Sequence, residues 1–343
     1  MGLFSSSRYT KEGPGVYADD PKRGPFYRFF QTYGNKFFKI VSTNFLLVIF
    51  NIPAIILGFF GMIYVLPQIN SVFQPTNFQK FITDAGITAT DSGATASDTA
   101  LQLYFLLVVF LVMFIVGMQL VSVGPVQTGI SYVYRNYARE STTFLWSDFV
   151  SSFKSNWKQS TIAAIISILM TGLIAANIIF YSSVYEGKYG QVFSAIFFMV
   201  FIFFMCIQIY IYPLIASLNL SLKNIYKNAV LFFLGRLLPT LGIFLVDVIV
   251  LMIIPFLMFL FLNYTGFALA ILYYIVFAFS FVQYLNTFFV WQQIERYIVK
   301  PQETDEESPD SDGQSPESAG QSTEAPRQSS VVARQSPKSI GRH

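Results

Sequence analysis

One acidic residue, Asp247, lies deep inside an apolar segment and is the first group whose chemistry needs an explanation. It stands about ten residues into the run from Leu237 to Leu262. A charged side chain at the centre of a bilayer costs on the order of 3 kcal/mol or more, so an intramembrane carboxyl is by default a candidate functional group. No Lys or Arg occurs at that depth, so we expect Asp247 to be protonated or bonded to amides, hydroxyls and water.

Four other polar side chains lie at similar depths in separate apolar segments: Asn51, Gln208, Gln283 and Tyr284. Because an α-helix rises about 1.5 Å per residue, all five groups could meet at one level in the inner half of a bilayer. Two interpretations stay open. The cluster is either the proton-coupling or substrate site of a transporter, or a set of interhelical hydrogen bonds worth roughly 0.6 to 2 kcal/mol each.

The composition argues against most enzymatic chemistry. The only cysteine is Cys206 and the only histidine is the last residue, His343, so His-based catalysis, Cys/His metal sites and an internal disulfide are excluded. There is no P-loop, no dinucleotide fingerprint and no pair of hydrolytic carboxylates. The net charge of +3 is too small to indicate a nucleic-acid partner. We therefore expect no catalytic, cofactor-binding or metal-binding residues, and no enzyme.

The elements that carry these polar groups are predicted to cross a membrane. Hydrophobic residues make up 54% of the chain and charged residues 12%, about half the charged share of a soluble protein. Six apolar runs are long enough to span a bilayer, at about 41–66, 101–123, 161–185, 191–215, 237–262 and 267–294. The short turns at 186–190 and 263–266 force antiparallel hairpins. The sequence thus predicts an all-α membrane protein with six transmembrane helices in three hairpins.

The distribution of basic residues predicts the orientation. Between residues 22 and 300, fourteen Lys or Arg residues lie close before the first span, close after the last one and in alternate connections, against two, Lys80 and Lys188, in the other connections. Cytoplasmic loops carry the excess of Lys and Arg. We therefore expect a multi-pass protein of the cell membrane with both termini in the cytoplasm.

The predicted cytoplasmic connections also have striped patterns. Apolar and aromatic residues recur at helical spacing around 126–137, 146–157 and 218–229, with basic residues beside them: Arg135, Arg139, Lys154, Lys158, Lys223 and Lys227. This pattern is typical of helices that lie in the interface, with their basic groups towards anionic headgroups of the lipid bilayer. We therefore predict amphipathic interfacial helices on the cytoplasmic face.

The chain divides into a membrane domain and two flanking segments. Residues 26–298 form the six-span domain, with an outer loop at 67–100. Residues 1–25 and 299–343 are polar and low in apolar content, and we expect disordered cytoplasmic termini.

Three stretches resemble the YesL family of bacterial integral membrane proteins. They are NFLLVIFNIP in the first span, GPVQTGISYVYRNYARE followed by FLWSDFVSSFKSNWKQS, and YPLIASLNLSLKNIYKNAVLFFLGRLLPTLG, so that the resemblance covers roughly residues 26–66 and 105–295. The family has no established biochemical activity, but its genes often lie beside those of carbohydrate-uptake ABC transporters and sensor kinases. The resemblance thus implies a role around sugar import, with such subunits as partners. This chain departs from the family core in its outer loop and in the tail after Pro301.

Two functions follow as hypotheses. The first is an accessory or scaffold component linked to carbohydrate uptake or its regulation, favoured by the basic-aromatic inner surface and the resemblance. The second is a secondary transporter or channel for a small solute, favoured by Asp247 and by three weak internal repeats, each an interfacial basic helix followed by a hairpin.

Overall fold

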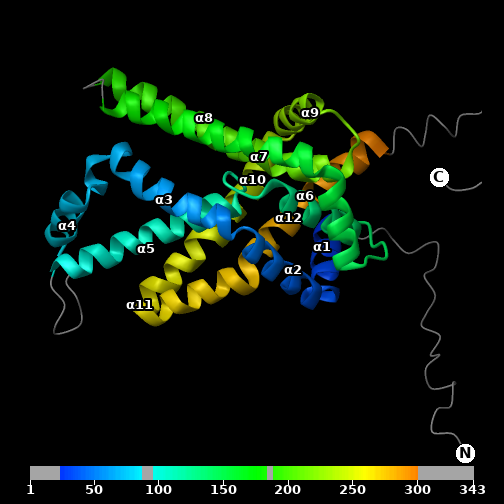
Figure 1. Ribbon diagram of the computed structural model, residues 1–343, viewed down its shortest axis with the longest axis horizontal. Helices are drawn as coiled ribbons and strands as arrows, with labels where there is room; N and C mark the ends of the chain where they lie inside the picture. The colour runs from blue at the N-terminus through cyan, green and yellow to red at the C-terminus, as the bar shows by residue number, and fades with distance from the viewer. Residues whose placement is uncertain (1–23, 87–95, 184–187, 300–343) are drawn as a thin grey trace, which may run out of the picture. The chain divides into compact units, whose positions relative to one another are not determined.

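The computed structural model describes residues 24–86, 96–183 and 188–299, and every regular element in these ranges is a helix (Figure 1). The described residues include six helical segments that are long and apolar enough to cross a membrane. They are Ile52–Ile69, Ser97–Gly117, Leu145–Ser183, Tyr189–Ser217, Leu237–Leu262 and Thr265–Val299. The predicted all-α, multi-pass fold class is therefore confirmed.

The first predicted span is two helices, because the chain breaks at Asn51. Helix α2 (Phe37–Phe50) ends there and α3 (Ile52–Ile69) begins directly after it. Pro53 has no N–H to continue the backbone ladder, and the Asn51 amide donates to the Leu47 carbonyl at 2.8 Å. Only α3 is long enough to span by itself, so the predicted span at about 41–66 is divided at Asn51.

The second predicted span ends six residues early. Helix α5 (Ala96–Gly117) stops where Gln119 adopts a left-handed conformation with φ of 62°. The Leu120 N–H then bonds the Ile115 carbonyl at 3.1 Å, and the Gln119 N–H bonds the Val116 carbonyl at 3.0 Å, which together form a Schellman C-cap. Residues 118–123 are irregular and half-buried or buried. Irregular backbone at membrane depth is tolerated where protein covers it.

Helix α6 (Gly124–Ala138) was predicted as an amphipathic interfacial helix with one exposed face, and the structure encloses it among other helices. All of its residues except Tyr132 and Arg135 are buried. It packs against α7 (Leu145–Ser183), α8 (Lys188–Ser217) and α12 (Phe279–Ile294). A Cβ at Gly124 would lie 2.0 Å from the Ser160 carbonyl oxygen, so only glycine permits this close approach of α6 to α7.

Helix α7 joins two elements that the sequence suggested were separate. It is one continuous helix of 39 residues, which contains both the striped segment around 146–157 and the third span. Helix α8 packs along α7, and the shorter α9 (Leu222–Gly235) follows and packs on α8. The turn at 184–187 between α7 and α8 is outside the described residues.

The last two spans form a hairpin that contains two π-helical stretches. The order is α10 (Leu237–Val248), a π stretch Ile249–Ile253, α11 (Ile254–Tyr273), a second π stretch Tyr274–Ala278, α12, and a terminal π stretch Glu295–Val299. The ribbon of α11 folds back on itself (Figure 1). Tyr273 donates its hydroxyl to the Val250 carbonyl at 3.2 Å across this hairpin.

The segments that connect the helices lie at two ends of the helical unit. A chain whose successive helices cross the membrane in opposite directions has this arrangement. At one end α1 (Pro25–Asn35) meets the end of α6, and Arg135 of α6 donates to the Ala216 carbonyl at the end of α8 at 2.9 Å. At the other end Ser182 of α7 donates to the Ile69 carbonyl of α3 at 3.4 Å. A 3-10 turn (Ser71–Phe73) and α4 (Pro75–Asp84) follow α3 there, and α4 packs against α5. We call these the basic end and the loop end.

Some predicted segments cannot be compared with the structure. The expected disorder at 1–25 and 299–343 falls almost entirely outside the described residues, as does the middle of the outer loop at 87–95.

Candidate functional site: the buried polar groups

The five predicted polar residues are all buried, but they belong to separate groups. Asp247, Asn51, Gln208, Gln283 and Tyr284 each have an exposed fraction of 3% or less. Among the described residues, no hydrogen bond joins Asp247 to the other four. Their hydrogen bonds divide the five residues into four local arrangements.

Asn51 and Gln283 do come together, through Gln127 of α6. The Asn51 carbonyl oxygen accepts from the Val123 N–H at 2.9 Å and from the Gln127 amide at 3.3 Å. Gln283 of α12 donates to the Gln127 carbonyl at 2.8 Å and to the Ser131 hydroxyl at 3.2 Å. These bonds connect the break between α2 and α3 with the break before α6.

A small cavity lies within this first group. It is lined by Leu47, Asn51, Val116, Gly117, Gln127, Phe279 and Gln283. About 10 Å³ of it is open to the centre of a water molecule, which is close to the volume that one water needs. We call this space the amide cavity.

Gln208 bonds to the irregular segment after α5 by way of α7. Its amide donates to the Ser167 hydroxyl, which in turn donates to the Leu120 carbonyl at 2.8 Å. Nearby, Ser122 and the Tyr212 hydroxyl are 3.2 Å apart and share a hydrogen bond. Ser167 of α7 thus satisfies the Leu120 carbonyl, a backbone group that a continuous helix would have satisfied itself.

Asp247 of α10 has a different environment. Its exposed fraction is 0%, and neither carboxyl oxygen has a hydrogen-bond partner of good geometry among the described residues. The side chains close enough to interact with it are Asn286 of α12 and Cys206 of α8. It is the least satisfied of the five predicted groups.

Tyr284 lies on another face of α12 from Gln283 and packs into an aromatic cluster. Its ring stacks on Phe29 of α1 with centroids 5.1 Å apart and meets Tyr134 of α6 edge-on at 5.5 Å. The buried hydroxyl of Tyr284 has no partner of good geometry. This residue holds α1 and α6 against α12, and it does not line the amide cavity.

Asn44 was not predicted as a site residue, yet its side chain makes three hydrogen bonds, two to the second π stretch and one to the start of α12. Its amide donates to the carbonyls of Tyr274 at 2.8 Å and Ile275 at 2.5 Å, and its oxygen accepts from the Ser280 N–H at 2.7 Å. A usable signal was present, since Asn44 precedes Asn51 by two helical turns in an otherwise apolar segment. The π stretch whose carbonyls it binds had no sequence signature.

The predicted basic residues divide by exposure. Arg139, Lys154, Lys158, Lys223 and Lys227 are exposed, whereas Arg135 is half-buried. Besides its bond to Ala216, Arg135 lies over the Tyr132 ring, with its guanidinium carbon 4.4 Å from the centroid. Burial lowers the pKa of Arg135, and the nearby Tyr132 partly opposes that shift. Arg135 therefore joins α6 to α8 inside the protein.

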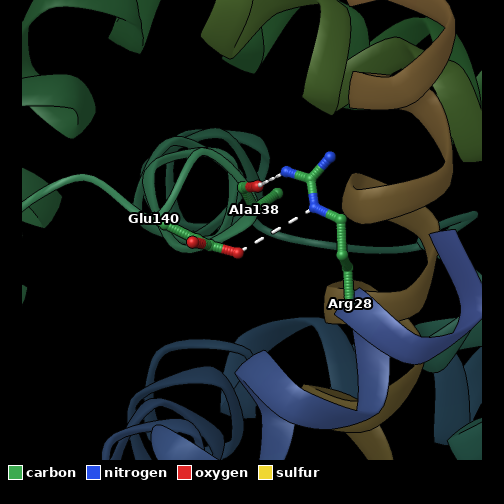
Figure 2. A network of polar contacts seen from close by, with 3 residues as sticks. All are labelled: Arg28, Ala138 and Glu140. Carbon is green, nitrogen blue, oxygen red and sulfur yellow. Dashed lines mark hydrogen bonds and ion pairs between the residues drawn. The ribbon is translucent and has the colours of Figure 1, made fainter. Parts of the chain in front are cut away.

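A second arginine fixes α1 to the end of α6 (Figure 2). Arg28 donates to the Ala138 carbonyl at 3.3 Å, and its Nε lies 3.9 Å from a carboxylate oxygen of Glu140. Glu140 has a φ of 57°, because it occupies the left-handed position of the Schellman cap that ends α6.

Comparison with known proteins places this central part of the chain in context. Residues 103–178 match a family model described as "Protein of unknown function, DUF624". The matched stretch contains most of α5, the irregular segment, α6 and most of α7. No curated protein and no solved structure matches the chain.

Proposed function

We propose that the protein is a non-enzymatic accessory or scaffold component of the bacterial cytoplasmic membrane, linked to carbohydrate uptake by ABC transporters or to its regulation. The family match over residues 103–178 is consistent with the resemblance to the YesL family. The link to carbohydrate uptake comes from that resemblance. Both termini are proposed to be cytoplasmic, on the strength of the Lys and Arg distribution.

The observation that favours a scaffold over a transporter is the state of the buried polar groups. Asn44, Asn51, Gln127, Gln208 and Gln283 all bond to neighbouring helices or to irregular backbone. The amide cavity that some of them line has room for about one water molecule. A sugar would need a site many times larger, so these groups are better explained as bonds that hold the helices together.

The surface proposed to meet a partner lies at the basic end. Gln159 of α7 donates to the Leu220 carbonyl just before α9 at 2.8 Å, so that α7 and α9 lie side by side there. Their exposed residues Lys154, Trp157, Lys158, Lys223 and Lys227 form what we call the lysine–tryptophan surface. It suits anionic headgroups together with an acidic segment of a cytoplasmic-side subunit.

Co-purification from the native membrane tests this proposal. The full-length tagged protein, extracted in mild detergent, should bring down a transporter or kinase subunit. Replacement of Lys154, Lys158, Lys223 and Lys227 by Gln should reduce that yield severalfold. A matched control, Lys39→Gln with Lys80→Gln, removes exposed lysines elsewhere and should leave the yield unchanged. A protein that purifies alone in every case would contradict the proposal.

A secondary transporter is the second candidate, and the unpartnered Asp247 is the observation that favours it. Proteoliposomes that contain only this chain should show no flux across a panel of sugars if it is an accessory protein. Flux that the wild type supports and Asp247→Asn abolishes would establish transport instead.

A further inference from the structure

The surroundings of Asp247 contain three buried acceptor atoms that have no hydrogen-bond partner. Both carboxyl oxygens are buried without a hydrogen-bond partner, and so is the carbonyl oxygen of Asn286, the side chain within reach. Buried acceptors are normally paired, since an unpaired one loses its water and gains nothing. A proton on the carboxyl would supply the missing donor.

No positive charge compensates the carboxyl in the part of the chain that the structure describes. Arg236 stands at the start of α10, eleven residues before Asp247 and so about 17 Å along the helix. Its guanidinium bonds the Tyr297 hydroxyl at 3.0 Å. An unpaired carboxylate in such a place is strongly unfavourable, because it loses its water and gains no compensating charge.

The helices packed on α10 supply other titratable groups, but none is a cation next to Asp247. From α8 these are Cys206 and Tyr210, and Tyr210 already shares a bond with Thr240 at 2.6 Å. From α9 they are Tyr226 and the exposed Lys223 and Lys227, and from α12 the nearest polar group is Asn286.

We propose that Asp247 is a proton-binding site, occupied in the folded protein as a neutral carboxylic acid. Its O–H donates to the carbonyl oxygen of Asn286, and the Asn286 amide can donate to the other carboxyl oxygen in return. This acid–amide pair joins α10 to α12. It goes beyond the proposed accessory function and does not depend on it.

A metal cation fits these residues less well than a proton. Hard cations take six or more oxygen ligands, whereas Asp247 has one amide and one thiol beside it. In the nearby π stretch, the carbonyls of Val250 and Leu251 already accept hydrogen bonds from the hydroxyls of Tyr273 and Tyr274.

Infrared difference spectroscopy on the full-length protein in lipid vesicles tests the proposal. The wild type minus Asp247→Asn spectrum should contain the carbonyl stretch of a protonated acid, above the amide I band. This carbonyl stretch should persist through neutral pH. It should move to higher frequency in Asn286→Leu, where the hydrogen bond from the Asn286 amide to the carboxyl group is lost. The matched control is Asp148→Asn, because Asp148 lies in the first turn of α7, where it accepts from the Phe144 N–H at 3.0 Å, and its difference spectrum should lack this stretch. Carboxylate bands for Asp247 at neutral pH would overturn the proposal.

A stability measurement distinguishes a proton from a cation even if Asn286→Leu fails to fold. Asn at position 247 can donate as the acid does, so Asp247→Asn should unfold within about 2 °C of the wild type. Replacement of sodium or potassium chloride by choline chloride should leave the thermal unfolding midpoints of the wild type and of Asp247→Asn unchanged. A midpoint that rises with sodium or potassium in the wild type, and not in Asp247→Asn, would assign a cation site and overturn the proposal.

Discussion

Amide side chains are the residues on which the interior of this protein depends. Asn44, Asn51 and Gln208 each bond, directly or through a serine, to backbone that a helix break or a π stretch has left unpaired. In the hydrocarbon core of a bilayer, unpaired backbone N–H and C=O groups cannot bond to water. Each amide side chain therefore supplies a hydrogen bond that the helix backbone cannot make. The helix breaks and π stretches are therefore stable only because buried amide side chains bond to the backbone groups that they leave unpaired.

Asn44 provides the sharpest test of this dependence. Asn44→Ala removes three buried hydrogen bonds to Tyr274, Ile275 and Ser280, and we expect a loss of about 2 to 4 kcal/mol in the free energy of unfolding. Unfolding in a detergent titration measures it. The control is Asn177→Ala, whose amide bonds only the Leu173 carbonyl one turn earlier in its own helix. Equal stabilities for the two variants would contradict the structural role of Asn44.

Glu140 allows backbone strain and charge to be separated. A non-glycine residue in the left-handed region costs roughly 1 to 2 kcal/mol, whereas an exposed ion pair such as that with Arg28 contributes about 0 to 1 kcal/mol. Glu140→Gly should therefore be as stable as the wild type or slightly more stable. Glu140→Gln retains the strain and loses the charge, so it should be slightly less stable. The reverse order in thermal unfolding would refute this assignment.

The sequence identified some of these residues and not others. Asp247, Asn51 and Gln283 were predictable because polar residues are rare inside apolar runs. Their grouping was not, since depth along a helix says nothing about the direction a side chain faces. Gln127, which bonds Asn51 and Gln283, and Asn286, which lies beside Asp247, are in segments rich enough in polar residues that no single one stood out.

At the scale of elements, helix α6 shows where amphipathic patterning misleads. A stripe of apolar residues beside two arginines is typical of an interfacial helix, yet α6 is enclosed by α7, α8 and α12. Its polar residues face other helices, where Gln127, Ser131 and Arg135 find partners. The number of apolar runs was predictable from the sequence, but which face of a helix meets lipid depends on the packing of the other helices.

The contact between α6 and α7 can be tested with a pair of glycines. Gly124→Ala would place its Cβ 2.0 Å from the Ser160 carbonyl oxygen, so α6 must move away from α7. We expect a loss of about 1 to 3 kcal/mol or failure to fold. A Cβ at Gly61 of α3 meets nothing within 4 Å, so Gly61→Ala should be neutral or stabilise by up to about 1 kcal/mol. A fully stable Gly124→Ala protein would show that the two helices do not pack this closely.

At the scale of the whole molecule, hydrogen bonds gather the ends of α6, α8 and α12 and the starts of α1 and α9 at the basic end. The end of α3 and the end of α7 meet at the loop end. This grouping agrees with six crossings and alternating connections. The proposed partner surface can serve its purpose only if the basic end faces the cytoplasm.

Cysteine accessibility measures that orientation directly. Cys206 is buried and can be replaced by Ala, and single cysteines can then be placed at the exposed positions Thr142, Ser221 and Thr76. A membrane-impermeant maleimide applied to intact cells should label Thr76→Cys. It should label Thr142→Cys and Ser221→Cys only after the cells are permeabilised. Labelling of either of these last two positions in intact cells would contradict the account.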